Sequence, residues 1–454
     1  MTVDVLRRPA PAVRQARVAV AVLFFTNGAL YANLLPRFPQ IKDDLGIGNT
    51  AYGLAVAAFA TGAVVAGPAA GVLVRRLGSA RVAVAGTLLT GAGILAAALA
   101  GSVWVFAAAL FLAGAMDAVT DVAQNAHGLR VQRRYGRSII NGFHAIWSIG
   151  AVTGGSMAAG AIALGLPRGQ HLLISGVVFA VAACVALRFC LPGPETEDAA
   201  AAAAPEAPSP SPEVPAGRAS APEAAEVRAG SEAGRGAWEA GKGSSEGAEA
   251  GSWGARGVRS AGRAVPGRGT VRVLAALVLI ATAGALVEDA GNSWAALYLS
   301  ESLHATATLA ASGYIALVGA QFVGRLVGDR LVDRFGQRTV ARTGGLVAAT
   351  GMGLALAVPT TAGTVLGFAT AGLGVATLVP AAMHEADELP GLKPGTGLTV
   401  VSWLMRLGFL LSPPVVGLVA DSTGLRAGLL VVPLAGVLVV ALSGVLQPRR
   451  GTTA

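Results

Sequence analysis

Long apolar runs separated by short polar loops make up most of the chain. The first extends from Val18 to Leu35, and five more lie near residues 51–74, 80–101, 103–129, 138–165 and 171–191. After a polar stretch, six further runs lie near residues 272–299, 307–331, 340–359, 361–384, 397–420 and 426–446. A helix of about 20 apolar residues crosses the hydrocarbon core of a bilayer. The pattern therefore predicts an all-α membrane protein with about twelve transmembrane helices.

The polar stretch divides the chain into three predicted parts. Residues 1–191 and 271–454 each hold six apolar runs, whereas residues 192–270 consist mainly of Ala, Pro, Gly, Ser and Glu. Such a composition cannot bury a core, so we expect a disordered linker between two six-helix halves. In the first half, Pro36 to Ile47 is expected to be a polar connection, and Thr50 is a candidate N-cap of the second helix.

Composition excludes several other classes of protein. Of the 454 residues 54% are hydrophobic and only 13% are charged, which is too apolar for a soluble enzyme. The net charge of +9 comes from arginines in short loops, so we expect no nucleic-acid partner. Cys184 and Cys190 end one apolar run and indicate neither a disulfide framework nor a metal site.

The loop charges predict how the helices are oriented. With both termini in the cytoplasm, the external loops hold only Arg37, Lys42, Arg168 and Arg426. The cytoplasmic side then holds the other loop arginines, which are Arg75, Arg76, Arg81, Arg130, Arg133, Arg134, Arg137, Arg330, Arg334, Arg338, Arg342, Arg449 and Arg450. This positive-inside bias predicts a multi-pass protein of the cell (inner) membrane, with both termini and the linker in the cytoplasm.

The two halves also match each other in sequence. Placing Gly78 on Gly336 aligns an arginine-glycine loop that follows the second apolar run of each half. The same shift aligns Leu73 with Leu331, Val74 with Val332, Arg76 with Arg334, Gly86 with Gly344, Gly93 with Gly351 and Gly114 with Gly372. A repeat of this kind predicts parallel halves related by an axis along the membrane normal.

These loops resemble the major facilitator superfamily, whose loop between helices two and three reads roughly Gly-x-Leu-x-Asp-Arg-x-Gly-x-Arg. The first copy extends from Gly71 to Gly78 with Arg81 one place late, and the second from Gly328 to Arg338. The resemblance implies two pseudo-symmetric six-helix bundles and a cytoplasmic gate. The gate candidates are Arg75, Arg76, Asp333, Arg334 and Arg338. Arg75 replaces the motif's acid in the first copy, which favours a latch of Asp333 with Arg334 and Arg338. Positive-inside topology alone is the alternative explanation of these arginines.

Two further stretches bear on the branch of the family. Asp121 to Asn125 and Phe143 to Gly150 resemble an uncharacterised bacterial branch near the fucose permeases. A glycine signature of drug-proton antiporters is half present, with Gly150 and Gly154, but Gly155 stands where that signature has proline. A drug or metabolite efflux antiporter therefore remains an alternative.

Carboxyl groups inside the apolar runs are the first candidates for function. Asp117, Asp121 and Gln124 fall on one stripe of a helix at 100° per residue. A carboxylate facing lipid costs roughly 2.5 kcal/mol or more. The stripe is therefore expected to line a transport pathway or, alternatively, to form hydrogen bonds between packed helices. Away from water a carboxyl group favours its neutral form and can carry a proton. We predict Asp117 or Asp121 as this carrier, with Glu288 and Asp289 as candidates in the other half, unless these two lie solvated at a helix end.

Other polar and aromatic residues within the runs are candidates for a substrate cavity. They are Asn27, Gln124, Asn125, Asn141, His144, Trp147, Asn292, Gln321, Trp403 and Arg406. Arg406 is expected either to hold a substrate anion or to pair with Glu288. Arg325 is expected either to belong to the cytoplasmic arginines or, one turn from Gln321, to face the same cavity as Gln321. Trp294 is expected to be an anchor at the membrane interface.

No catalytic constellation is visible in the sequence. It has no Walker loop, no nucleotide fingerprint and no His or Cys cluster at metal spacing, so we expect no enzyme activity, no cofactor and no metal. We predict a monomeric secondary transporter in the lipid bilayer that moves a small organic solute by alternating access, coupled to protons. A receptor or scaffold that signals through the linker is the alternative from another class.

Overall fold

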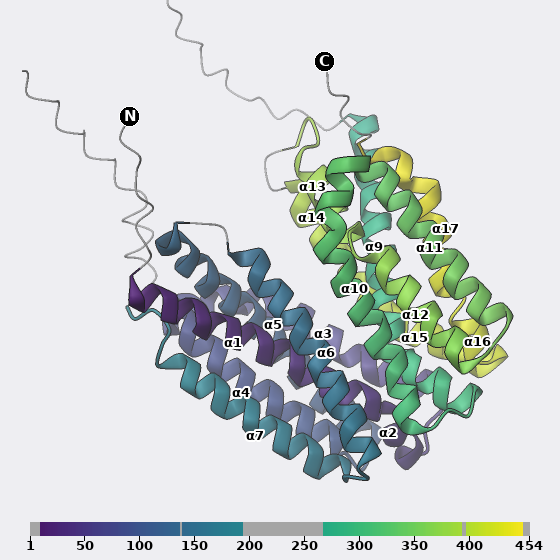
Figure 1. Ribbon diagram of the computed structural model, residues 1–454, viewed down its shortest axis with the longest axis horizontal. Coiled ribbons are helices and arrows are strands. Elements are labelled where there is room, and N and C mark those ends of the chain that lie inside the picture. The colour runs from purple at the N-terminus through teal and green to yellow at the C-terminus, as the bar shows by residue number, and fades with distance from the viewer. Residues whose placement is uncertain (1–9, 137–138, 194–266, 393–395, 448–454) are drawn as a thin grey trace, which may run out of the picture. The chain divides into compact units, whose positions relative to one another are not determined.

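The computed structural model describes residues 10–136, 139–193, 267–392 and 396–447. These residues form helices and connecting turns, and no strand occurs among them (Figure 1). Almost all of the predicted linker lies outside the described residues, so its disorder remains a prediction. The division into residues 1–191, 192–270 and 271–454 likewise remains a prediction.

The first half contains six long helices and two short ones. They are α1 (Pro11–Leu34), η1 (Leu35–Arg37), α2 (Phe38–Leu45), α3 (Asn49–Leu77), α4 (Ser79–Ala98), α5 (Val103–Tyr135), α6 (Ile140–Ala163) and α7 (Arg168–Leu187). Ser102 caps α5 by accepting a hydrogen bond from the backbone N–H of Val105, which fixes where that helix begins. Gly136 ends it in the left-handed conformation, with φ 70°.

The second half repeats this order with more interruptions. Its helices are α9 (Arg268–Leu297), η2 (Tyr298–Ser302, a π-helical turn), α10 (Ala307–Phe335), α11 (Gln337–Ala357), α12 (Thr361–Val375), α13 (Leu378–Asp387), α14 (Thr396–Leu404), α15 (Arg406–Thr423), α16 (Leu425–Gly428), α17 (Val431–Leu442) and η3 (Ser443–Val445). The tenth apolar run is divided into α12 and α13, and the eleventh into α14 and α15. Gly78 and Gly336, the anchors of the sequence repeat, both have positive φ at the same turn of each half.

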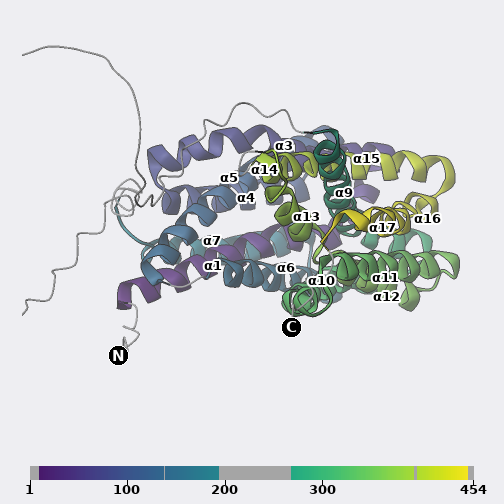
Figure 2. The ribbon, with the colours of Figure 1, turned by 90° about the horizontal axis from the view of Figure 1, so that it is seen from above.

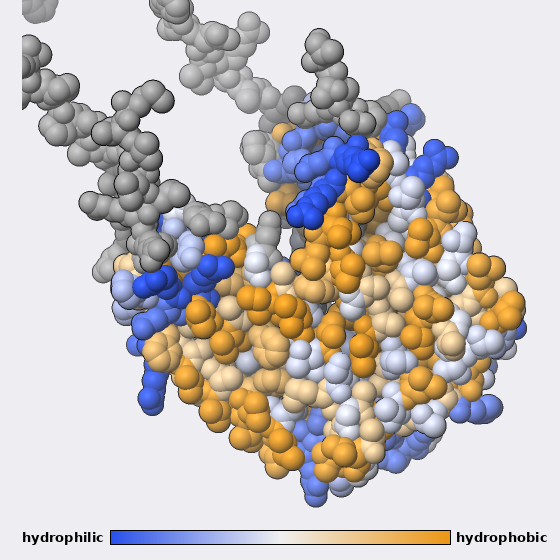
Figure 3. Space-filling model, in the orientation of Figure 1, coloured by the Kyte–Doolittle hydropathy of each residue, from blue (hydrophilic) through white to orange (hydrophobic). Residues whose placement is uncertain are grey.

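Twelve helices or pairs of helices among the described residues are long and apolar enough to cross a bilayer. The predicted all-α fold with about twelve spans is therefore confirmed. Figure 3 shows apolar side chains over most of the visible helical surface, with hydrophilic side chains gathered toward the helix ends. This is the distribution expected of a protein surrounded by lipid.

The bundle has two ends, here called the terminal end, where α1 begins and η3 ends, and the distal end, which carries α2 and α16. Seen from above, the helices of the first half lie beside those of the second, and α3 runs alongside α15 (Figure 2).

Glycines allow the helices to approach at backbone distance. A Cβ atom at Gly62 would lie 2.0 Å from the carbonyl oxygen of Phe111, and one at Gly114 would lie 1.9 Å from that of Phe59. α3 and α5 can therefore pack this closely only with glycine at these two positions. Between the halves, a Cβ atom at Gly53 of α3 would lie 2.3 Å from the carbonyl oxygen of Pro413 in α15.

Two sequence-based expectations near α2 need revision. The connection from Pro36 to Ile47 is polar only in part, because Phe38–Leu45 forms an amphipathic helix whose Phe38 and Ile41 side chains are fully buried. Thr50 is not an N-cap, because α3 already begins at Asn49 after Gly48. The group that caps α3 comes from the other half of the protein, so the sequence near Thr50 could not have identified it.

Candidate functional site

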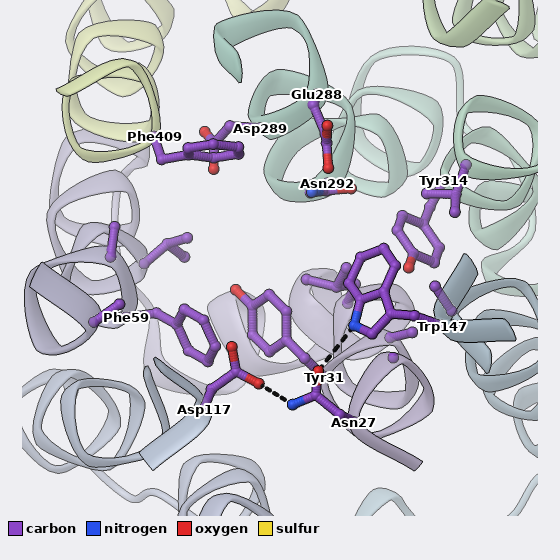
Figure 4. A pocket seen from close by; sticks show the side chains of 18 of the residues that line it. Asn27, Tyr31, Phe59, Asp117, Trp147, Glu288, Asp289, Asn292, Tyr314 and Phe409 are labelled. Atoms are coloured by element: carbon purple, nitrogen blue, oxygen red, sulfur yellow. Dashed lines mark hydrogen bonds between the residues drawn. The ribbon is translucent and has the colours of Figure 1, made fainter. Parts of the chain in front are cut away.

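A cavity of about 290 Å³ lies between the two halves, within the membrane-spanning part of the bundle. Helices α1, α3, α5 and α6 line it from the first half, and α9, α10 and α15 from the second. Figure 4 shows the side chains that point into it. Its volume is near the lower end of the usual range for ligand sites, about 300–1,000 Å³.

Asn27 is the centre of a hydrogen-bond network on the first-half wall of the cavity. Its Nδ2 donates to Oδ1 of Asp117 at 2.7 Å, and its Oδ1 accepts from Nε1 of Trp147 at 2.8 Å (Figure 4). Nε2 of the fully buried Gln124 lies 3.4 Å from the same Oδ1. One amide thus connects α1, α5 and α6, and it holds the Asp117 carboxyl group at the cavity.

Glu288 forms an ion pair on the opposite wall. Its Oε2 accepts a hydrogen bond from Nε2 of Gln321 at 2.7 Å and lies 3.7 Å from Nη2 of Arg325. Of the two interpretations of Arg325, the geometry favours the one in which it faces the same space as Gln321, because its guanidinium group reaches the Glu288 carboxylate. Glu288 is also not solvated at a helix end, because its side chain is 19% exposed.

This ion pair predicts a nonadditive pair of mutations. Glu288→Gln leaves Arg325 without its carboxylate, and we expect the melting temperature to fall by several degrees. Arg325→Gln added to Glu288→Gln removes the uncompensated charge, so the double variant should recover part of the loss. Thermal unfolding of purified protein, followed by tryptophan fluorescence, measures both. Additive losses would show that the two groups do not interact.

Asp289, the next residue, is more deeply buried than Glu288. The residue is 9% exposed, and its Oδ1 lies 3.4 Å from the hydroxyl of Ser293. Its Oδ2 has no hydrogen-bond partner among the described residues, and no cationic side chain lies within ion-pair distance. A carboxyl group of this kind is an unusual component of a cavity wall.

Aromatic rings form much of the remaining cavity surface. The ring of Tyr31 stacks on that of Phe59 with a centroid distance of 4.1 Å, and Trp147, Tyr314 and Phe409 also line the cavity. Phe409 and Asp289 lie on the same side of the cavity (Figure 4). The cavity thus combines acidic groups with flat apolar faces.

A polar vestibule lies between the cavity and the terminal end. It consists of Asp121, Asn125, His144 and Arg325, each one or two turns closer to that end than a cavity residue of its own helix, and Arg406 of the cavity wall borders it. Asp121 interacts electrostatically with His144 and Arg406, and His144 with Arg325, so four helices face one space here. Asp121, His144, Arg325 and Arg406 are exposed. Water therefore reaches the cavity from the terminal end.

The distal end of the cavity is closed by contacts between the two halves. Lys42 of α2 pairs with Glu301 of η2 at 2.8 Å, and the hydroxyl of Tyr52 donates to the carbonyl oxygen of Ser293 at 2.8 Å. The fully buried Trp294 packs edge-on against Tyr52 with a ring distance of 5.1 Å. The predicted role of Trp294 as an interfacial anchor is therefore wrong, because the residue belongs to this seal.

Asp421 of α15 caps a helix of the other half. Its carboxylate accepts hydrogen bonds from the backbone N–H groups of Asn49 at 2.9 Å and Thr50 at 2.8 Å, the first two residues of α3. Gly48 offers no side-chain cap, so Asp421 supplies the anionic group that a helix N-terminus favours.

Removing this cap should weaken the distal seal. For Asp421→Ala we expect a loss of about 1 kcal/mol from the distal-closed state, the usual cost of losing an N-cap. Spin labels at positions 43 and 423, after replacement of Cys184 and Cys190, should then show a larger share of long distances. An unchanged distance distribution would mean that the cap contributes nothing to closure.

The predicted gate residues lie at the terminal end and are not joined as a latch. Arg75, Arg76, Asp333 and Arg334 are exposed, and Asp333 forms no ion pair with any residue that the structure describes. Arg338 instead donates to the carbonyl oxygens of Leu446 at 3.0 Å and Gly444 at 2.6 Å. It holds the end of the last helix in this conformation.

The structure brings eight of the predicted site residues together at the cavity. They are Asn27, Asp117, Trp147, Glu288, Asp289, Asn292, Gln321 and Arg406. Asp121, Asn125 and His144 lie in the vestibule, Gln124 lies behind Asn27, and the side chain of Trp403 is 61% exposed and does not line the cavity. The side chain of Asn141 lies outside the described residues.

Sequence reasoning missed Tyr31, Phe59, Tyr314 and Phe409. Two of them could have been found by helical spacing, since Tyr31 follows Asn27 by one turn and Phe409 follows Arg406 by three residues. Phe59 lies in a uniformly apolar run that carries no such signal.

Two six-helix halves around a polar cavity define a class of membrane carrier that alternates access to one site. Sequence comparison agrees with this architecture: the family model of the Major Facilitator Superfamily matches residues 20–389 and, again, 273–454. The chain therefore belongs to the Major Facilitator Superfamily and is a secondary transporter, not an enzyme. Its branch within the family remains a prediction.

Individual relatives are similar over nearly their whole length. Membrane protein MosC of Rhizobium meliloti is 26% identical over 422 residues, which cover 93% of this chain and 88% of that protein. Among solved structures, a D-xylose-proton symporter has a TM-score of 0.67 at 13% identity and covers 97% of this chain and 99% of its own. A bacterial homologue of the human lysosomal transporter Spinster, in an inward-facing and unoccupied conformation, has a TM-score of 0.66 at 13% identity. The match covers 98% of this chain and 99% of that chain. At these identities the structures show the fold alone.

Proposed function

We propose that this protein is a proton-coupled carrier of a small organic solute, with Asp117 as the group that binds and releases the proton. The observation that carries the proposal is a carboxyl group at a cavity between the halves, bonded through Asn27 to a cavity-lining tryptophan. A carboxyl group at this depth favours its neutral form, so it takes up a proton from one side and loses it where water has access. The D-xylose-proton symporter with the same fold is consistent with such coupling.

The same network explains how the proton would affect the solute. When Asp117 is ionised it accepts from Nδ2 of Asn27, which leaves Oδ1 of Asn27 to accept from Trp147. A proton on Asp117 weakens the first of these bonds and loosens the position of the tryptophan ring in the cavity. Asp121 in the vestibule is the alternative carrier, because it lies one turn closer to the water-filled side.

We also propose that the terminal end faces the cytoplasm across the cell (inner) membrane and that the monomer is the working unit. The supporting observations are the exposed arginines at the terminal end, among them Arg75 and Arg76, and a cavity built from one chain. In this orientation the present conformation is open to the cytoplasm and closed to the outside. Reporter fusions at either terminus, active only in the cytoplasm, test the orientation.

Transport in liposomes tests the proposed function. Purified protein is reconstituted, a pH gradient is imposed, and radiolabelled sugars, amines, amino acids and organic acids are assayed for movement against their gradients. At least one solute should be concentrated or depleted only while the pH gradient lasts, and an ionophore that collapses the gradient should abolish this. Solute exchange that does not depend on the pH gradient would mean that the protein is a carrier without proton coupling. The direction of gradient-driven movement distinguishes uptake from efflux.

A further inference from the structure

The acidic and basic side chains that line the cavity are unequal in number. Three carboxyl groups line it, those of Asp117, Glu288 and Asp289, and one cation, Arg406. Glu288 is already compensated by Arg325, and Arg406 interacts with Asp121 in the vestibule. Asp117 and Asp289 remain without a cationic partner in the described protein. The residues that line the cavity therefore include an excess of acidic groups.

Asp289 is the acidic group without a short hydrogen bond among the described residues. Its exposed fraction is 9%, its Oδ1 has only a long contact to the hydroxyl of Ser293, and the hydroxyl of Ser412 also interacts with the carboxyl group without forming a geometrically complete hydrogen bond to Oδ2. The titratable groups facing it come from every neighbouring helix: Glu288 on its own helix, Tyr31, Tyr52, Tyr314, Asp117 and Arg406. None of them forms an ion pair with it. An ionised carboxylate in this place is costly until a cation arrives.

The rings beside Asp289 fit the other part of such a ligand. Phe409 lines the same side of the cavity as Asp289, and the stacked rings of Tyr31 and Phe59 face the same cavity (Figure 4). Aromatic faces attract organic ammonium groups, and they also cover an apolar or hydroxylated carbon skeleton. Because Oδ2 of Asp289 is shielded from water, the side chains around it have to shift for a ligand to reach it.

We propose that the solute is a small organic cation and that Asp289 is the anchor of its ammonium group, with Phe409 of the same cavity wall as an aromatic face for the bound cation. This inference rests on the proposed function, because it names the chemical class of the solute of the same cavity. It does not depend on Asp117 as the carrier of the coupled proton.

A measurable consequence follows from the cost of an unpaired carboxylate. In the empty cavity Asp289 keeps its proton, and an arriving ammonium group releases it because the ion pair replaces the O–H bond. Binding therefore releases about one proton per cation. The affinity for the cation should also fall as the pH is lowered within the range in which the amine stays charged.

Binding to the purified full-length protein in nanodiscs tests the proposal without a membrane gradient. The probes are amines paired with neutral counterparts of similar shape: tyramine with 4-ethylphenol, cyclohexylamine with cyclohexanol, and glucosamine with glucose. Calorimetry in two buffers of different ionisation enthalpy gives affinity and proton release together. We expect at least one amine to bind at least about tenfold more tightly than its neutral counterpart, with the release of a proton.

Two variants and one control identify the residue. Asp289→Asn should weaken amine binding about tenfold or more and abolish proton release, and Phe409→Leu should weaken binding a few-fold while keeping the proton release. Asp43→Asn removes an exposed carboxylate at the distal end and should change neither. If Asp289→Asn does not fold, two measurements still test the anchor: the pH dependence of amine affinity in the wild-type protein, and amine binding with proton release in Phe409→Leu.

The possible results separate this inference from the proposed function. Preference for neutral or anionic probes, or full amine affinity in Asp289→Asn, would overturn the anchor. Amine binding without any proton-driven movement in liposomes would support the anchor and contradict the coupling. Proton-driven movement of a neutral solute would support the coupling and contradict the role of Asp289 as the anchor.

Discussion

Asp117→Asn is expected to abolish the dependence of transport on a proton gradient while leaving solute exchange intact. Asparagine keeps an acceptor for Nδ2 of Asn27, so the bonds that position Asn27 and Trp147 survive. What is lost is the group that ionises. One proton moving through a driving force of 100 mV supplies about 2.3 kcal/mol, which corresponds to a concentration ratio of about 50, and the variant should bring this ratio to about 1.

The measurement compares two assays on the same proteoliposomes. Gradient-driven accumulation should fall to the level without a gradient, and counterflow, in which labelled and unlabelled solute exchange, should continue at a similar rate. Asp43→Asn is the matched control, since it removes a carboxylate of the same size far from the cavity. If Asp121→Asn abolishes coupling and Asp117→Asn does not, the vestibule carboxyl group is the carrier.

The second large effect is expected at the backbone contacts between α3 and α15. A methyl group at Gly53 would lie 2.3 Å from the carbonyl oxygen of Pro413, and one at Gly417 would lie 2.4 Å from that of Asn49. Neither neighbour can move aside, because both are main-chain atoms. Overpacking of this kind costs about 1–3 kcal/mol, and here it applies only to the distal-closed state.

Gly53→Ala and Gly417→Ala should therefore lower the ratio of closed to open distal ends by about five- to 150-fold. Transport should fall with it, because the distal end has to close in every cycle. Gly67→Ala lies on α3 as well, where a Cβ atom meets nothing within 4 Å, and it is the control. Spin labels at positions 43 and 423 report the distance across the distal end. Full transport with an unshifted distance distribution would refute this account.

The overall architecture could be predicted from sequence because each span carries its own signal. An apolar run of about 20 residues becomes a helix in lipid whatever its neighbours are, since every backbone group must find its partner within the segment. The carboxyl groups within such runs also identify themselves: Asp117, Glu288 and Asp289 all prove to line the cavity.

The remainder of the site depends on which helices become neighbours. The pairing of Glu288 with Arg325 links residues 37 positions apart in two helices, and the cap of α3 comes from Asp421, more than 370 residues away. Trp403 illustrates the opposite case: an aromatic residue within a span can equally face outward, and its 61% exposure follows from the rotation of a short helix. The sequence gives the position of a residue along its helix. The direction in which that residue faces depends on the rotation of the helix about its axis, which is set by packing against other helices.

The cap on α3 has a consequence for the kinetics of the whole cycle. Each time the distal end opens, the first N–H groups of α3 lose the Asp421 carboxylate, and Lys42 parts from Glu301. The loss of these contacts makes the state with an open distal end less favourable, so the protein without solute favours the state in which the vestibule is accessible. A molecule without solute thus spends most of its idle time exposed to one compartment, and its initial rates measured from the two sides should differ even when the driving forces are equal.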